Sequence, residues 1–361
     1  MLVDCKYERV ELAAAWPRMR RNGTILDTDR LRLVAGIYRP HNAPATGLTA
    51  VLLHCNEQTK ESWEGVLARL LPSATPLVAA VAIDFVACGE SAAANRGKLG
   101  LGTRPLDGTY DLIEVIRALD LPAPIVLIGH SLGAVQGLWA AAMYPRLFER
   151  VVAIEPPLAV ASVMTVFYAR LLAVARSLPA TFTSREAANK WIDRSYMAAF
   201  DPAVLERQRG LLLYDEPDGS VSWTMTADQS QQMYHAMAYD AVQVVRALKF
   251  VHGPVSLLRC SKNSWMPDDA VDIALRETPE IELVLMEDAV HLCVLQNPAV
   301  VANTLKPLLA KTWAGWERKQ AAEKQLAAVP RAELLRRDHE THARGLDSVI
   351  QPIDVAARSK L

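Results

Sequence analysis

The sequence lacks a charge imbalance. Its 361 residues carry 39 Lys and Arg against 40 Asp and Glu, which gives a formal net charge of −1. A strong field of one sign is what draws a protein to nucleic acid or to an anionic lipid surface. We therefore expect no nucleic-acid partner and no anionic membrane surface as partner.

Closely spaced cysteines are also absent. The five cysteines are widely scattered and form no CxxC pair. A disulfide framework or a structural zinc site requires paired cysteines at short spacing. This pattern favours a reducing compartment, and because the chain has no metal or nucleotide motif either, we expect it to work without a cofactor.

Long apolar runs are missing as well. A membrane-spanning helix needs about 18 or more consecutive apolar residues. The nearest candidate, "PLAVASVMTVFYARLLAVA" from Pro157, is interrupted by Arg170 and predicts an amphipathic helix. The N-terminal stretch has early acidic residues and no apolar core, so we predict neither a signal peptide nor a membrane span.

What the chain does have is an alternation of short apolar runs with helical patterns, in a composition that is 51% hydrophobic. Runs rich in Val and Ile without polar alternation are typical of parallel strands covered on both faces. The pattern predicts an α/β fold with a mostly parallel, doubly wound sheet. The strands are expected at 30–38, 49–53, 78–83, 125–128, 151–154, 255–258 and 281–285, and the helices at 61–71, 109–119, 132–144, 268–277 and 298–309.

One long interval breaks this alternation. Residues 157–250 have a helical pattern and predict an inserted helical cap over the active-site end of a core formed by residues 1–156 and 251–310. The Met and aromatic positions of the cap favour helix packing over ligand contact. Residues 311–361 predict a charged helical extension.

The sequence "IVLIGHSLGA" places one serine between two glycines at a strand-to-helix junction. The pattern G-x-S-x-G is weak alone, but a strand before it and a helix after it make it specific. Gly129 and Gly133 leave room for a sharp turn that presents Ser131 at the carboxyl edge of the sheet. We predict Ser131 to be a nucleophile.

A serine hydroxyl needs a base to remove its proton. His291, in "VLMEDAVHLCVLQNP", follows the last predicted strand and precedes the final core helix. When a G-x-S-x-G serine comes first along the chain, the catalytic histidine is expected at this place, after the last strand. His130 lies within the turn and is expected to point elsewhere. His291 is the predicted base.

The acidic partner is harder to assign. Such an acid usually follows the next-to-last strand, but the residue expected at that position is about Ser264, which is not a carboxylate. Glu155 emerges from the neighbouring strand "VVAI" at the catalytic edge and is the preferred acid. Three later carboxylates remain as alternatives: Asp268, Asp269 and Asp288.

The oxyanion of an acyl-transfer intermediate needs two backbone N–H donors. One is expected from Leu132, the residue after the nucleophile, and the other from Asn56 or its neighbour Glu57 in the loop "LLHCNEQTKESW". Cys55 in that loop is a minor alternative nucleophile.

With these residues the chain resembles the α/β-hydrolase superfamily from Arg30 to about Leu309. More narrowly, it is similar to fungal peroxisomal hydrolases related to yeast peroxisomal lipase, toxin-biosynthesis hydrolases and the mycophenolic acid acyl-CoA hydrolase. In that family the acid is an Asp that maps onto Glu155, and Cys55 stands where Ala or Gly is usual. The motifs that carry the resemblance are "HCNEQTKESW", "GESAAANRGKLG", "IVLIGHSLGA", "YPRLFERVVAIEPP", "REAANKWI", "DGSVSW" and the terminal "SKL".

The final residues Ser359, Lys360 and Leu361 match a peroxisomal address that an import receptor binds. Together with the resemblance, they predict a matrix serine hydrolase that cleaves a small-molecule acyl substrate, an acyl-CoA thioester or an ester, in secondary metabolism. A lipase or carboxylesterase, an acyltransferase with the same residues, and a non-catalytic ligand-binding homologue are the alternatives. A homodimer is also compatible with the sequence.

Overall fold

The computed structural model describes residues 3–20, 22–25, 28–73, 75–100, 103–158, 164–278, 280–330, 333, 335–337 and 339–342. The chain divides into two compact units, Met1–Trp313 and Ala314–Leu361. The first unit contains the sheet and all residues discussed below as candidate catalytic groups. No helix in the described ranges is both long enough and apolar enough to cross a membrane.

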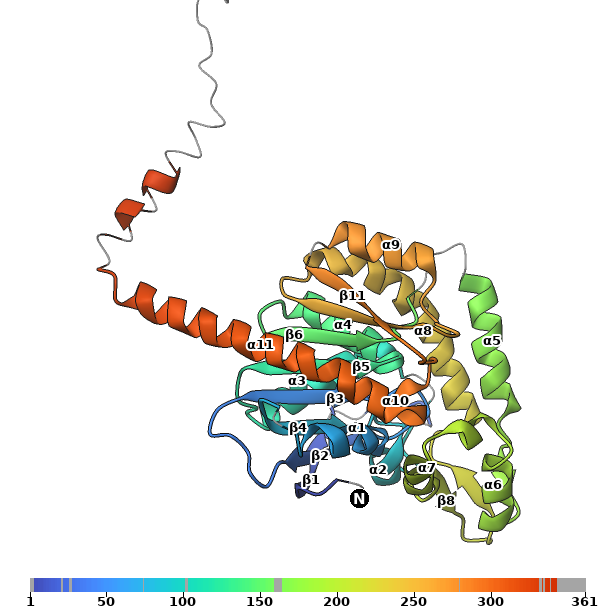
Figure 1. Ribbon diagram of the computed structural model, residues 1–361. Coiled ribbons are helices and arrows are strands. Elements are labelled where there is room, and N and C mark those ends of the chain that lie inside the picture. The colour runs from blue at the N-terminus through green and yellow to red at the C-terminus, as the bar shows by residue number, and fades with distance from the viewer. Residues whose placement is uncertain are drawn as a thin grey trace, which may run out of the picture. The chain divides into compact units, whose positions relative to one another are not determined.

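An eight-stranded sheet forms the centre of the first unit (Figure 1). Only β2 runs against the other strands, since it is antiparallel to both of its neighbours. The mostly parallel sheet predicted from the sequence is confirmed. In spatial order the strands are β1 (Lys6–Ala13), β2 (Arg32–Arg39), β4 (Leu77–Ile83), β3 (Leu48–Leu53), β5 (Ile125–His130), β6 (Arg150–Ile154), β10 (Val255–Cys260) and β11 (Ile281–Met286).

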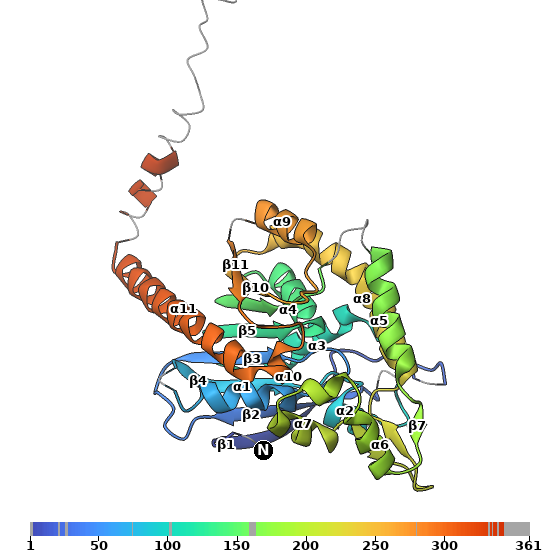
Figure 2. The same cartoon turned by 45° about the vertical axis from the view of Figure 1, so that its right-hand side comes forward.

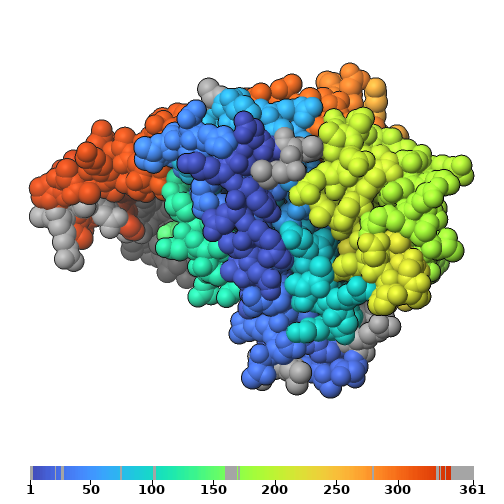
Figure 3. Space-filling model, turned by 90° about the horizontal axis from the view of Figure 1, so that it is seen from below, coloured from blue at the N-terminus to red at the C-terminus, as the bar shows by residue number. Residues whose placement is uncertain are grey.

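The two strands at the β1 edge differ from the sequence-based expectation. β1 was not predicted, because most of its side chains are exposed and it has no apolar run. The segment that contains it (dark blue) lies across the surface of this unit (Figure 3). β2 was predicted among the parallel strands, but it is antiparallel to its neighbours. The sequence could not show this, because a buried apolar run indicates that both faces of a strand are covered and says nothing about the direction of the strand.

Helices cover both faces of the sheet. Alternate residues of β3 point to opposite faces, so Val51 and Leu52 belong to different hydrophobic clusters. The Val51 face packs against α3 (Pro105–Ala118), α4 (Leu132–Met143) and α9 (Asp268–Glu277). The Leu52 face packs against α1 (Glu64–Leu70) and the beginning of α11 (Pro298–Ala327). The short helices α2 (Gly89–Ala94) and α10 (Cys293–Gln296) follow β4 and β11.

The segment between β6 and β10 is mainly helical, and α5, α6 and α7 lie together on one side of the sheet (Figure 2). Its small antiparallel sheet, in the order β7-β9-β8, was not predicted because strands of two or three residues have too little periodicity. Phe182, Trp191 and Trp223 pack together there. The elements are α5 (Met164–Ser177), β7 (Thr181–Phe182), α6 (Arg185–Ile192), η2 (Tyr196–Ala199), α7 (Pro202–Arg209), β8 (Leu213–Asp215), β9 (Val221–Trp223), α8 (Ala227–Ala247) and η3 (Leu248–Phe250).

Candidate active site

Ser131 occupies a sharp turn between β5 and α4. Its backbone has φ 53° and ψ −115°, a region that residues with a side chain rarely adopt. A Cβ on Gly129 would lie 2.3 Å from the carbonyl oxygen of Gly133, and one on Gly133 would lie 2.5 Å from that of Leu53. Neither neighbour is a flexible side chain, so both positions require glycine. The turn leaves Ser131 only 5% exposed.

His291 lies in the loop between β11 and α10, with its ring facing Ser131. The distance from Nε2 to Ser131 Oγ is 3.1 Å. Burial lowers the pKa of His291, even though Glu155 beside it acts in the opposite direction. The imidazole is therefore neutral at pH 7, and a neutral ring can accept the proton of the hydroxyl.

Glu155 completes a line of hydrogen bonds from the serine. Its Oε2 lies 3.2 Å from His291 Nδ1, so Nδ1 carries the ring proton and donates it while Nε2 remains free to accept. Glu155 is fully buried, and burial raises its pKa. The hydrogen bond and charge of His291, together with backbone N–H donors, outweigh that effect and hold the pKa below its ordinary value.

Three further donors surround this carboxylate. Oε1 accepts from the Cys260 N–H and from the Ser264 hydroxyl, both at 2.7 Å, and Oε2 accepts from the Trp265 N–H at 2.8 Å. Ser264 thus occupies the position where the sequence suggested a catalytic acid, and it donates a hydrogen bond to Glu155, which follows the neighbouring strand β6. The donors explain how a charge can be held in a buried site.

The alternative acids make contacts elsewhere. The Asp268 side chain, 82% exposed, lies 2.6 Å from Arg259, and that of Asp288, 80% exposed, lies 2.8 Å from Lys262. Asp269 accepts a hydrogen bond from the Ala270 N–H. Among these carboxylates, the structure brings only Glu155 to the histidine.

Two neighbours of His291 were missed from the sequence. The Trp265 ring stacks on the His291 ring with centroids 3.7 Å apart and planes 8° from parallel. His130, expected to point away, donates its Nε2–H to the His291 carbonyl oxygen at 2.7 Å and so supports the backbone of that residue. The position of His130 next to Ser131 in the sequence could have indicated that it supports the site. No local sequence pattern indicates the stacking of Trp265.

The expected oxyanion donors lie next to the serine turn. Leu132 is the first residue of α4, and the first N–H groups of a helix have no acceptor within it. The close approach of Gly133 to Leu53 and His54 places the loop between β3 and the 3-10 helix η1 (Lys60–Trp63), which contains Asn56 and Glu57, beside the beginning of α4. The choice between Asn56 and Glu57 as second donor remains a prediction.

Cys55, in the same loop, is only 3% exposed. Burial raises the pKa of its thiol, so the reactive thiolate is strongly disfavoured. This disfavours Cys55 as a nucleophile. In the described ranges, no group of three or more His, Cys, Asp or Glu side chains is arranged to hold a metal ion. The predicted targeting residues Ser359, Lys360 and Leu361 lie outside the described residues.

The order of the sheet and the serine turn at the end of β5 define an α/β-hydrolase fold. The family described as "Alpha/beta hydrolase family" matches residues 50–304, and the chain belongs to that family. The expected resemblance to this superfamily is confirmed.

Relatives among known proteins are consistent with this assignment. The chain is 34% identical over 165 residues to the peroxisomal membrane protein LPX1 of Saccharomyces cerevisiae, a match that spans 42% of each protein. The structure of the peroxisomal alpha-beta-hydrolase Lpx1 from the same yeast matches with a TM-score of 0.75 at 23% identity, covering 90% of this chain and 99% of that one. An E-2-(acetamidomethylene)succinate hydrolase matches with a TM-score of 0.62 at 19% identity, covering 76% of this chain and 94% of that one. At such identities the structural matches show a shared fold.

Proposed function

We propose that this protein is a serine hydrolase that cleaves an acyl ester or thioester through an acyl-enzyme. The observation that carries the proposal is the continuous line of hydrogen bonds from Ser131 through His291 to Glu155, in which the serine and the histidine are each 5% exposed and Glu155 is fully buried. Such a line is the arrangement that makes a serine hydroxyl nucleophilic.

In this mechanism Ser131 Oγ attacks the substrate carbonyl carbon while its proton passes to His291 Nε2. The N–H groups of Leu132 and of Asn56, or its neighbour Glu57, bind the oxygen that becomes negative. Collapse of the intermediate releases the alcohol or thiol, which takes the proton from His291. A water molecule then repeats the sequence and frees the acid, while Glu155 stabilises the imidazolium in both halves.

The proposed substrate class is an acyl-CoA thioester or ester, and the proposed location is the peroxisomal matrix. The terminal tripeptide "SKL" and the similarity to a yeast peroxisomal protein support the location. Acyl groups are handled there as CoA esters, which favours a thioester. We also propose that residues 157–250 act as a cap over an apolar acyl pocket, since Met233 and Met237 of α8, within this segment, are buried in the same hydrophobic cluster as Leu132 beside the serine.

The deciding experiment combines covalent labelling with turnover. A fluorophosphonate should label the wild-type protein at Ser131, and Ser131→Ala should abolish both labelling and hydrolysis, a loss on the order of 10⁴-fold or more. Substrates should be acyl-CoAs and p-nitrophenyl esters of graded chain length. Residual activity of Ser131→Ala above a tenth of wild type would overturn the assignment of Ser131 as the nucleophile. A wild-type protein that binds acyl-CoA but is not labelled by the fluorophosphonate would indicate a ligand-binding protein.

A further inference from the structure

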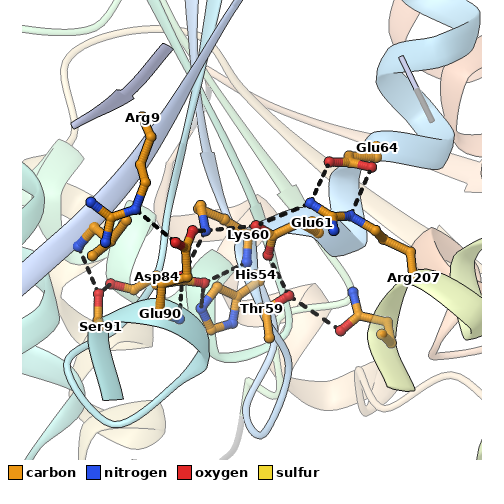
Figure 4. Close-up of polar contacts among 12 residues, drawn as sticks. Arg9, His54, Thr59, Lys60, Glu61, Glu64, Asp84, Glu90, Ser91 and Arg207 are labelled. Carbon is orange, nitrogen blue, oxygen red and sulfur yellow. Dashed lines mark hydrogen bonds and ion pairs between the residues drawn. The ribbon is translucent and has the colours of Figure 1, made fainter. Parts of the chain in front are cut away.

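The loop that contains both candidates for the second oxyanion donor, residues 54–59, is held firmly on its core side. Lys60, which ends the loop, donates its backbone N–H to Asp84 Oδ1 at 2.7 Å and its Nζ to Oδ2 of the same carboxylate at 3.0 Å (Figure 4). The first residue of the loop, His54, accepts the Phe85 N–H at 3.2 Å. Asp84 and Phe85, the two residues that follow β4, therefore hold the two ends of the loop.

A separate set of contacts holds the middle of the loop from the cap side. Glu57 Oε1 accepts a hydrogen bond from the Ser230 hydroxyl, and Oε2 accepts one from the Tyr196 hydroxyl at 3.4 Å. Tyr234 contributes a further hydroxyl to the same carboxylate. Asn56 Nδ2 lies 3.5 Å from Ser230 Oγ, so both candidate donor residues contact α8. We call these contacts of Asn56 and Glu57 with the cap the latch.

The backbone of Glu57 is in a conformation that needs support. Its φ of 66° lies in the left-handed region, which a glutamate adopts rarely and keeps only where its surroundings hold it. The core-side anchors act on Lys60 and His54, at the ends of the loop, while the side chain of Glu57 is bound by hydroxyls of the cap. The cap therefore helps to set the direction of the N–H groups at residues 56 and 57.

The cap is also attached to the core independently of this latch. Arg207 of α7 lies 3.3 Å from Glu64 and 3.8 Å from Glu61, and Thr59 donates its hydroxyl to Gln208 at 3.2 Å (Figure 4). Loss of the Glu57 contacts should consequently leave the cap in place and alter the loop locally.

We infer that Glu57 is a positioning residue that couples the seating of the cap to the placement of the second oxyanion donor. The inference rests on the proposed function and deepens it. An oxyanion hole completed only beneath a seated cap links catalysis to the enclosure of the substrate, which excludes water from the reacting carbonyl.

The test compares Glu57→Ala and Ser230→Ala with the matched control Ser222→Ala. Ser222 also donates its hydroxyl to a glutamate, Glu216, but both partners belong to the cap. Each latch variant should lower kcat by about ten- to a hundredfold with KM nearly unchanged, since a misplaced donor affects the transition state more than the bound substrate. The double variant should lose less than the two single losses combined, because the two changes share the contact between Glu57 and Ser230.

Two further readouts separate positioning from a general loss of structure. A trifluoromethyl ketone that imitates the tetrahedral intermediate should lose affinity for the latch variants in proportion to kcat/KM. Hydrogen–deuterium exchange should become faster at residues 54–59 in the latch variants and stay unchanged in Ser222→Ala. Latch variants that match the control in turnover and exchange would overturn the inference. A wild type without turnover would overturn the proposed function alone, because the exchange measurement still decides whether the latch exists.

Discussion

Glu155 is the residue whose surroundings are most specialised. Its backbone has φ 49°, its side chain is fully buried, and its carboxylate accepts hydrogen bonds from His291, Cys260, Ser264 and Trp265. Donors from β10 and the loop after it thus compensate a charge that comes from β6. A buried carboxylate with this many donors is held in one orientation, which the proposed mechanism needs to orient the imidazole.

We predict that Glu155→Gln will lower kcat by roughly two to four orders of magnitude, because glutamine keeps the shape but removes the charge that stabilises the imidazolium. Steady-state kinetics on the best substrate of the screen measures the effect. Asp268→Asn is the matched control, since that exposed carboxylate pairs with Arg259 and should cost little. Equal losses in the two variants would contradict the assignment of the acid.

The pH dependence of kcat/KM gives a second prediction at this scale. Only the neutral form of His291 accepts the serine proton, and burial lowers its pKa in the folded protein. As pH falls, activity should therefore decline with a midpoint below the ordinary histidine pKa of about 6.5. Because Glu155 raises the pKa of His291, the remaining activity of Glu155→Gln should decline at a still lower pH. A wild-type midpoint above 6.5 would be inconsistent with this reasoning.

At the scale of elements, the junction of β5 and α4 determines whether the serine is presented at all. Backbone atoms of α4 occupy the space that a side chain at Gly129 would need. The junction is therefore closed by backbone packing, and it tolerates little adjustment because both elements are buried in the core.

We predict that Gly129→Ala will lower the free energy of unfolding by about 1–3 kcal/mol, since its Cβ would lie 2.3 Å from the Gly133 carbonyl oxygen. Urea unfolding measures this value. The control is Gly210→Ala, at a position in the right-handed helical region with no atom within 4 Å of the added Cβ. It should change the free energy by no more than about 0.5 kcal/mol. Similar values for both variants would show that the junction has room to relax.

At the scale of the whole molecule, the proposed catalytic edge depends on strands brought together from distant parts of the chain. Arg150 at the start of β6 hydrogen-bonds Ser256 of β10 at 2.7 Å and Glu282 of β11 at 2.6 Å. Burial lowers the pKa of this arginine, and Glu282 opposes that effect. The contacts link the three strands whose opposite ends lead to Glu155, Ser264 and His291.

The proposed location gives a prediction at the same scale. Deletion of Ser359, Lys360 and Leu361 should move a fluorescently tagged protein from peroxisomes to the cytosol with unchanged activity in vitro, because the tripeptide acts as an address and not as an anchor. Two residues appended after Leu361 should have the same effect, since the receptor binds a free C-terminus. Peroxisomal fluorescence that survives both changes would contradict the proposed address.

The sequence by itself determined the features that depend on local sterics and on order along the chain. Gly129 and Gly133 around Ser131 specify a sharp turn because only glycine fits there, and the position of His291 follows from its place after the last strand. The apolar runs likewise predicted the mostly parallel sheet. Edge strand β1 and the small sheet β7-β9-β8 were missed, because exposed or very short strands bury too little to produce a pattern.

Only the tertiary structure decided which groups meet. Glu155 and His291 are 136 residues apart in the sequence, and they approach because β6 and β10 are neighbours in the sheet and β11 lies next to β10. The stacking of Trp265, the hydrogen bond from His130 and the contact of Glu57 with Ser230 of α8 arise in the same way. Such contacts depend on how strands are ordered and on how the inserted segment packs, and neither is encoded in a local pattern of residues.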